Sequence, residues 1–353
     1  MASITDVARL AGVSTATVSR VLSAAPYAVS PATRERVLEA ARSLDYVPNA
    51  LARGLNKSHI PVVGVIVHDI MDPYFAEVVR GVEDAAAVGG FLVVTCSSDR
   101  IAARELSYVR LLRSMRVATV IFAGSGLADA TLNTEIRKHL AAMRAYGAAV
   151  VHLSPHAEGE ADIGVDNAAG IAGMVAALVA RGHRRIAFLA GPTSLYVSHR
   201  RLDGYRRGLV AAGIAFDKRL VVNTGFNREA GALAIDALLA GEAPFSAVCA
   251  ANDLLALGAM GRLAALGIQV PREVSVAGFD DIETAAIAPP GLSTVRLPLH
   301  EIGRRAFAFA ERVLAGERPI RETLPTELVL RGSTAKAPRE PIAVGGRAVA
   351  GVA

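Results

Sequence analysis

The sequence has no tryptophan, only two cysteines and few aromatic residues, and it lacks any long uninterrupted apolar run. Glycine, proline or a charged residue breaks each apolar run well before the roughly 18 residues that a transmembrane helix requires. The N-terminus also lacks the basic and apolar regions of a signal peptide. Cys96 and Cys249 stand apart in apolar, strand-like runs, so we interpret both as buried thiols rather than a disulfide or a metal site. These absences predict a cytoplasmic protein with no membrane partner.

The sequence also lacks the motifs of the common enzyme classes. It contains no zinc-protease HExxH, no Walker loop and no nucleophile elbow. The segment from Gly124 to Asp129 follows an apolar run, but it lacks the third glycine of a dinucleotide-binding fingerprint. The neighbouring Asp280 and Asp281 do not by themselves define a general acid and base. We therefore expect no enzyme activity and no cofactor.

The positive charge of the chain is concentrated at its two ends. The net charge is +5, of which residues 1–58 carry +3 and the tail from Thr334 carries +2, so residues 59–333 are neutral. A basic N-terminal segment is what contact with phosphates requires, although solvated helices often carry as much charge. At 353 residues, the chain has the length of two or three domains.

Two short helices joined by a glycine turn are predicted at the N-terminus. A capping box at Ser3 and Asp6 starts the first helix, Gly12 ends it, and Ser14 is a ready N-cap for the second. The outer face of the second helix is small and polar, and it carries Thr15, Ala16, Ser19, Arg20 and Ser23. This arrangement is typical of a DNA-binding helix-turn-helix, with a solvated helical hairpin as the alternative.

From about residue 60 onward, apolar runs of strand length alternate with helical segments. The runs span residues 61–67, 90–96, 118–124, 148–153, 185–191, 246–251 and 274–279. Such regular alternation predicts βαβ units with buried parallel sheets. The number of runs exceeds what one small sheet holds, so we expect two similar α/β subdomains with a cleft between them. Ligands of such sheets bind at the carboxyl ends of the strands.

Three stretches resemble the LacI/GalR family of bacterial transcription regulators: TDVARLAGVSTATVSRVL, SPATRERVLEAARSLDYVPN and ALARGL. The resemblance extends more loosely to about residue 332. It implies an all-α helix-turn-helix headpiece followed by an α/β effector domain similar to periplasmic binding proteins, with two subdomains and parallel sheets.

The resemblance also sets the expected domain boundaries. The DNA-binding domain would span residues 1–47, the hinge helix or linker 48–58, and the effector-binding and dimerisation domain 59–332. The N-subdomain would comprise about 60–160 and 293–322, and the C-subdomain about 161–292 and 323–332. Residues 333–353 lack the leucine heptads of a tetramerising helix, so we expect a disordered tail and a homodimer.

The resemblance implies that DNA contacts come from the second helix and the hinge. Thr15 and Ala16 would lie nearest the base edges, and Arg20 is the best candidate for a bidentate contact to guanine O6 and N7. Phosphate or mixed contacts suit Ser14, Thr17 and Ser19. The remaining candidates are Ser23, Asn49, Ala52 and Leu55.

The predicted hinge helix, Pro48 to Asn56, is short. Its nine residues fall below the roughly 12 that an isolated helix needs in water, and Gly54 costs about 1 kcal/mol relative to alanine. The family often carries serine at this position. We therefore expect a segment that becomes ordered only on DNA. The resemblance gives Leu55 the role of a wedge that enters the minor groove, whereas simple packing is the alternative.

Polar and aromatic side chains that follow the predicted strands are the candidate effector contacts, by the same resemblance. Asp72, Tyr74 and Phe75 place an aromatic plate beside a carboxylate, which suits a sugar. The further candidates are Asp166, Arg201, Phe226, Asn252 and Asp280. Each has an ordinary structural alternative, because an aromatic residue at a helix start can belong to the core and a polar residue after a strand can be an N-cap. We assign the N-cap of the helix near residue 253 to Asp253.

Two further positions bear on the ligand. Leu195 and Val197 lie where purine-binding members carry polar contacts, which argues against a nucleobase. Leu297 lies at a position that is often glutamine in the family, so the identity of the ligand stays open.

The sequence therefore predicts a homodimeric repressor that binds double-stranded operator DNA under the control of a small-molecule effector, a sugar or sugar derivative. A solute-binding component of a transport system is the alternative, but it requires an export signal and no DNA-binding segment. A metabolic enzyme on this fold would need a catalytic cluster that the sequence does not provide.

Leu55→Ala should weaken operator binding strongly and leave dimerisation intact, because it removes the wedge that kinks the operator centre. Electrophoretic mobility shift measures the first effect and sedimentation velocity the second. Equal operator affinity of the two proteins would rule out the wedge.

Overall fold

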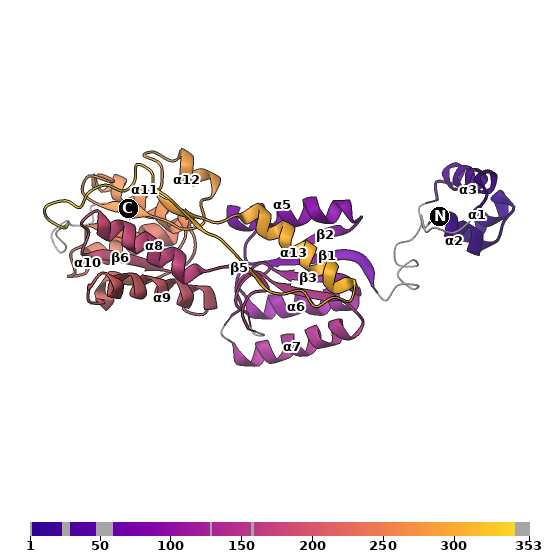
Figure 1. Cartoon of the computed structure of the whole chain (residues 1–353), viewed down its shortest axis with the longest axis horizontal. Helices are drawn as coiled ribbons and strands as arrows, with labels where there is room; N and C mark the ends of the chain where they lie inside the picture. The colour runs from indigo at the N-terminus through magenta and orange to yellow at the C-terminus, as the bar shows by residue number, and fades with distance from the viewer. Residues whose placement is uncertain (1, 23–28, 47–58, 128, 157–158, 343–353) are drawn as a thin grey trace, which may run out of the picture. The chain divides into compact units, whose positions relative to one another are not determined.

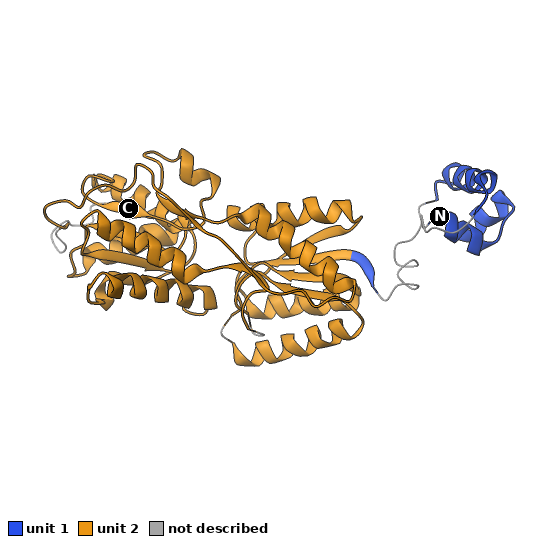
Figure 2. Ribbon diagram, viewed as in Figure 1, with its two compact units in different colours: residues 1–61 blue, residues 62–353 orange. Residues whose placement is uncertain are grey.

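The computed structural model describes residues 2–22, 29–46, 59–127, 129–156 and 159–342. The chain divides into two compact units, residues 1–61 and 62–353, which Figure 2 shows in different colours. The predicted hinge, residues 48–58, lies outside the described residues. Among the described residues, no helix is long and apolar enough to cross a membrane.

The first unit is built from α1 (Ile4–Ala11), α2 (Thr15–Leu22) and α3 (Pro31–Ser43). The predicted capping box is confirmed, because Ser3 Oγ accepts from the Asp6 amide at 3.3 Å and Asp6 Oδ2 accepts from the Ser3 amide at 3.0 Å. Gly12 ends α1 with a φ of 66°, a conformation that favours glycine. The small core contains Val7, Val18 and Val37, one fully buried valine from each helix.

The second unit contains two four-stranded parallel sheets, which confirms the predicted fold class. The first has the order β2-β1-β3-β4, with β1 (Ile60–Val67), β2 (Leu92–Ser97), β3 (Val117–Phe122) and β4 (Ala149–His152). The second has the order β7-β6-β8-β9, with β6 (Ile186–Ala190), β7 (Val221–Asn223), β8 (Ala247–Ala250) and β9 (Ser275–Ala277). We call the two halves the N-lobe and the C-lobe (Figure 1).

Helices cover the sheets of both lobes (Figure 1). The N-lobe carries α5 (Pro73–Val88), α6 (Ala102–Ser114), α7 (Ala130–Ala145) and α13 (Leu299–Leu314). The C-lobe carries α8 (Asn167–Ala180), α9 (Tyr196–Ala211), α10 (Arg228–Ala240), α11 (Asp253–Ala265), α12 (Glu283–Ile287) and the 3-10 turn η1 (Lys218–Leu220). The inner strands β1, β3, β6 and β8 are almost entirely buried, as expected for parallel sheets covered on both faces. The edge strands β2 and β7 are largely half-buried or exposed. Cys96 and Cys249 are both free and buried, as predicted.

Short strands join the two lobes. Strand β5 (Ile163–Val165) pairs with β11 (Glu322–Leu324), and β10 (Thr294–Arg296) pairs with β12 (Glu327–Val329). We call these four strands the crossing segments, because the chain passes through them between the sheets. Since α13 lies between β10 and β11 in sequence yet packs on α5 and β4, the chain returns to the N-lobe before it ends in the C-lobe.

Close packing of α13 on α5 depends on two glycines. A Cβ at Gly81 would lie 2.0 Å from the His300 carbonyl oxygen, and a Cβ at Gly303 would lie 2.1 Å from that of Val78. Neither backbone atom can move away without shifting its helix. This contact therefore fixes the position of α5 against α13. The first turn of α5 carries Tyr74 and Phe75.

The tail expected to be disordered, residues 333–353, is ordered over residues 333–342, which we call the C-terminal strap. Ser333 is fully buried, and its Oγ donates to the Val276 carbonyl at 2.6 Å. Ala335 donates to Ser275 Oγ at 3.0 Å, and Ile342 donates to the Phe245 carbonyl at 3.0 Å. The expectation is wrong for the strap because the edge of the C-lobe sheet supplies its hydrogen-bond partners. Residues 343–353 lie outside the described residues.

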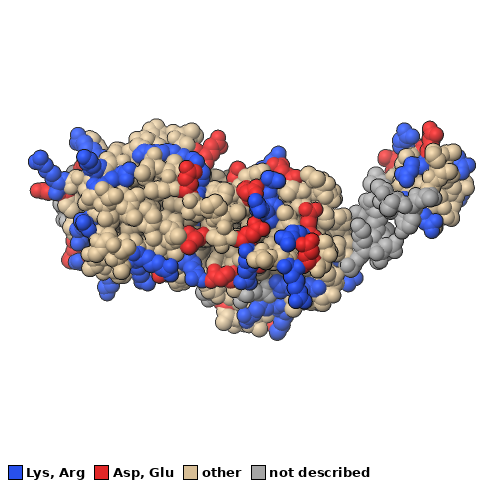
Figure 3. Space-filling view, viewed as in Figure 1, with Lys and Arg blue, Asp and Glu red and all other residues tan. Residues whose placement is uncertain are grey.

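Acidic and basic side chains are interspersed over the visible face of the second unit (Figure 3). This agrees with the neutral net charge of residues 59–333. The face carries no large area of a single sign.

Truncation after Gly332 should destabilise the protein by about 3 kcal/mol or more, because several buried hydrogen bonds contribute about 0.5–1.5 kcal/mol each. Truncation after Ile342 is the matched control, since it keeps the strap. Urea unfolding followed by circular dichroism measures both. Equal midpoints of the two truncated proteins would show that the strap contributes no stability.

Candidate functional site

Residues after the carboxyl ends of the parallel strands in both sheets line one cavity of about 50 Å³. The N-lobe contributes His68, Asp72, Tyr74, Phe75, Arg100, Ala123, Ser125 and Ser154. The C-lobe contributes Leu195, Val197, Arg201, Phe226, Asn252 and Asp280. Each of the eight strands is followed by at least one of these residues, which is the place where ligands bind open parallel sheets.

Most of the effector contacts predicted from the sequence meet in this cavity. Seven line it together: Asp72, Tyr74, Phe75, Arg201, Phe226, Asn252 and Asp280. Asp166 does not. Its carboxylate is exposed and caps α8 by accepting from the Ala169 amide at 2.9 Å, so the structure gives Asp166 the structural alternative. Leu297 is buried but is not part of the lining.

Two cavity residues also cap helices. Asp72 Oδ1 accepts from the Tyr74 amide at 3.1 Å at the start of α5, and Asn252 Oδ1 accepts from the Leu255 amide at 2.9 Å at the start of α11. The N-cap of α11 is therefore Asn252 and not Asp253, contrary to our expectation. Capping and cavity lining are compatible, because each cap uses only Oδ1 and leaves Asp72 Oδ2 and the Asn252 Nδ2 group outside the cap.

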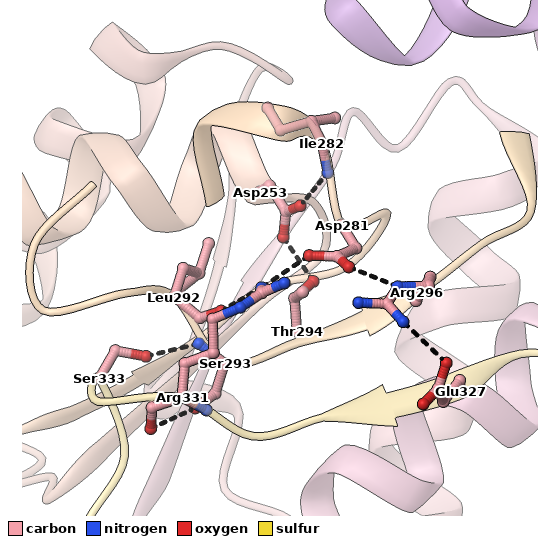
Figure 4. A network of polar contacts seen from close by, with 10 residues as sticks. All are labelled: Asp253, Asp281, Ile282, Leu292, Ser293, Thr294, Arg296, Glu327, Arg331 and Ser333. Carbon is pink, nitrogen blue, oxygen red and sulfur yellow. Dashed lines mark hydrogen bonds and ion pairs between the residues drawn. The ribbon is translucent and has the colours of Figure 1, made fainter. Parts of the chain in front are cut away.

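The side chain of Asp253 forms hydrogen bonds away from the start of α11. It is fully buried, and it accepts from Thr294 Oγ1 at 2.6 Å and from the Ile282 amide at 2.9 Å (Figure 4). Burial raises the pKa of Asp253 to about 7, against the opposing hydrogen bond from Thr294. Its side chain ties α11 to β10.

The C-lobe side of the cavity is organised by Arg201. Arg201 Nη2 lies 3.2 Å from Asp280 Oδ1, its Nε donates to Asn167 Oδ1 at 2.9 Å, and its Nη1 donates to the Ala251 carbonyl. The guanidinium also lies 4.1 Å from the centre of the Phe279 ring. Burial raises the pKa of Asp280 well above its usual value, although the charge of Arg201 opposes the shift.

Four polar lining residues were not predicted from the sequence: His68, Arg100, Ser125 and Ser154. All four follow the ends of strands. The rule that ligands bind at the carboxyl ends of parallel strands could therefore have predicted them, as it did the other lining residues. His68 Nε2 lies 2.9 Å from the Ser125 carbonyl oxygen, which can only accept, so Nε2 carries the hydrogen. Burial lowers the pKa of His68 to about 4, and the ring is therefore neutral near pH 7.

The loop that carries Asp280 is anchored to the crossing segments through Asp281 (Figure 4). Asp281 accepts from Arg296 Nε at 2.7 Å and from Arg331 Nη1 at 2.6 Å. Burial raises the pKa of Asp281, but these two arginines outweigh it and hold the pKa below its usual value. Arg296 also donates to Glu327 of β12 at 3.0 Å. These contacts tie this loop to the strands that join the lobes.

The first unit presents the outer face of α2 to solvent. Ser14, Thr15, Ala16 and Arg20 are exposed, and Thr17 and Ser19 are half-buried. Ser14 Oγ accepts from the Thr17 amide at 3.2 Å, so the predicted N-cap is present. Val18 and Val21 are buried on the opposite face. The other predicted DNA contacts, Ser23, Asn49, Ala52 and Leu55, lie outside the described residues.

Comparison with known proteins shows to which protein family the chain belongs. The model of the lacI family of bacterial regulatory proteins matches residues 3–49, and the model of the periplasmic binding protein-like domain matches residues 175–334. The repressor CytR of Escherichia coli (strain K12) is 35% identical over 344 residues, which are 96% of this chain and 97% of CytR. The chain belongs to the LacI family.

Solved structures of other LacI-family proteins share the whole fold. The transcriptional regulator CelR in complex with cellobiose is 31% identical, has a TM-score of 0.70, and covers 94% of this chain and 100% of CelR. The Lac repressor dimer bound to operator and the anti-inducer ONPF is 27% identical, has a TM-score of 0.81, and covers 95% of this chain and 99% of that one. These relatives are transcription regulators, so this LacI-family chain is a DNA-binding regulator and not an enzyme.

Asp72→Asn should remove one component of the pH dependence of stability in this LacI-family protein. Burial raises the pKa of Asp72 to about 6 from 3.8, so the folded state holds the proton more tightly. The free energy of unfolding of the wild type should therefore fall as pH rises from about 4 to 6, by up to about 3 kcal/mol at 1.36 kcal/mol per pKa unit.

Asparagine keeps the cap on Tyr74 through its amide oxygen, so the variant isolates the charge. Urea unfolding of both proteins at a series of pH values gives the comparison. Parallel curves for the two proteins would contradict the assignment.

Proposed function

We propose that this chain is a cytoplasmic, homodimeric transcriptional repressor that binds a near-palindromic operator under the control of a small sugar-like effector in the interlobe cavity. The observation that carries the proposal is the cavity itself, which is lined from both lobes and anchored through Asp280 and Asp281 to the crossing segments. A ligand there contacts both lobes at once, so it can change the angle between them.

The size of the cavity supports control by movement of the lobes. Pockets for small molecules are typically about 300–1,000 Å³, whereas this one holds about 50 Å³. A sugar therefore has to open the cleft in order to enter. Its binding free energy then favours the open arrangement over the closed one, which is the condition for a ligand to shift a conformational equilibrium.

The lining suits a hydroxylated ring with an apolar face. Tyr74, Phe75 and Phe226 supply aromatic surface, and Asp72, Asn252 and Asp280 supply hydrogen-bond partners for hydroxyl groups. The cellobiose in the CelR complex is a sugar, which supports the same ligand class here. Leu195 and Val197 add apolar surface that offers no hydrogen bonds to a nucleobase.

The expected coupling between effector and operator is about 1–3 kcal/mol and reciprocal. Release of DNA by the effector is the direction we propose. The Lac repressor dimer bound to its operator supports one headpiece per operator half-site. A transport component would have no use for residues 3–49, which match the DNA-binding family model.

Arg20→Ala should weaken binding to the preferred duplex by about 5- to 150-fold, because a bidentate contact to guanine contributes about 1–3 kcal/mol. The preferred duplex is selected from a random pool, and affinity is then measured by fluorescence anisotropy at fixed salt. Arg42→Ala on α3 is the charge-matched control, and it should change sequence preference little. Absence of any preferred duplex for the wild type would overturn the proposed function.

A further inference from the structure

Two arginines line the cavity, and they differ in how the protein uses them. The guanidinium of Arg201 is engaged by Asp280, Asn167 and the Ala251 carbonyl. Each of its three guanidinium nitrogens has an acceptor within the protein. Arg201 therefore contributes a hydrogen-bonded scaffold for Asp280.

Arg100 has no such partner. Within the described ranges of the chain, no acceptor forms a hydrogen bond or an ion pair with it, and its Nε is buried without a partner. Burial lowers the pKa of Arg100, which is the sign of a cation removed from water at a cost. Its guanidinium carbon lies 5.9 Å from the centre of the Phe226 ring, so it faces the opposite lobe across the cavity.

The acids nearest to Arg100 are used elsewhere. Asp99 pairs with Arg104, Asp69 accepts from the Met71 amide at 2.9 Å, and Asp72 caps α5. These three carboxylates interact with Arg100 only through longer-range electrostatic attraction and form no ion pair with it. Asp72 also lines the cavity, but burial already disfavours its charged form.

The backbone at Arg100 is also in a conformation that its side chain disfavours. Asp99 has a φ of 52° and Arg100 a φ of 60°, and a non-glycine residue in this left-handed region costs roughly 1–2 kcal/mol. The turn is held by hydrogen bonds from the Asp99 amide to the His68 carbonyl and from the Ile101 amide to the Ser98 carbonyl. Glycine would fit this position better, so the stability of the fold does not explain an arginine here.

We propose that Arg100 binds an anionic group of the effector, which makes the ligand a sugar acid or a phosphorylated sugar rather than a neutral sugar. The planar guanidinium donates two parallel hydrogen bonds to a carboxylate or a phosphate, and this pairing is strong where water is excluded. The anion lies on the N-lobe side and the hydroxyls contact Asp280 and Asn252 of the C-lobe, so the charged ligand bridges the lobes. This inference rests on the proposed function, whose effector site it specifies.

Arg100→Gly tests the proposal, because it removes the guanidinium and relieves the left-handed backbone. Without ligand, this variant should be at least as stable as the wild type. Arg116→Gly is the matched control, since Arg116 also has a positive φ of 54° and lies 5.2 Å from a tyrosine ring, but outside the cavity. Arg100→Lys keeps the charge without the planar fork.

Thermal unfolding is measured with orthophosphate and with matched sets: glucose, glucuronate and glucose 6-phosphate, and ribose and ribose 5-phosphate. The anionic members should raise the Tm of the wild type and of Arg116→Gly more than their neutral parents do. Arg100→Gly should lose this excess, and its Kd for the best anionic probe should rise at least about tenfold. Arg100→Lys should be intermediate. The uronate and phosphate arms separate the two sources of the anion.

Orthophosphate has no sugar stereochemistry that could fail to fit the cavity. The measurement with orthophosphate therefore does not depend on which sugar is chosen. Equal protection of wild type and Arg100→Gly by orthophosphate, including none, overturns the proposal, as does equal protection by neutral and anionic sugars. Operator binding without ligand should be unchanged in the control Arg116→Gly, because Arg116 lies outside the cavity. A wild type with no preferred duplex would defeat the proposed function, while the ligand arms would still report on Arg100.

Discussion

Two neighbouring carboxylates with different partners hold the second unit together at its functional centre. Asp280 contacts Arg201 inside the cavity. Asp281 instead contacts Arg296 of β10 and Arg331, which follows β12 (Figure 4). Both residues have a positive φ, 116° and 60°, so the chain turns sharply between them. This one turn therefore links the cavity, through Asp280, to the segments that join the lobes, through Asp281.

The parallel sheets and most of the cavity could be predicted from the sequence for a simple physical reason. A parallel strand buried on both faces leaves a continuous apolar run, and the chain must leave that run at the edge where ligands bind. Asp72, Asn252 and Asp280 were recognisable because a carboxylate or an amide at such an edge is conspicuous. His68 and Ser125 obey the same rule, but a serine or histidine after a strand resembles many ordinary loop residues.

The errors arose where tertiary contacts decide between locally equivalent choices. Asn252 and Asp253 are both good N-caps, and only the buried Thr294 hydroxyl and Ile282 amide draw Asp253 away from that role. The strap was misjudged for a related reason. Its composition resembles that of a disordered tail, but Ser333 meets the free edge of β9, which sequence patterns cannot place.

The position of the strap has a consequence for biosynthesis. The C-lobe lacks β12 and the partners of Ser275 and Val276 until residues 327–335 have been translated. The N-lobe likewise waits for α13. By contrast, the three N-terminal helices share a core built from residues within the first 46 positions, so that core can form as soon as they leave the ribosome. A nascent chain therefore completes the helices that recognise DNA well before the lobes that control them.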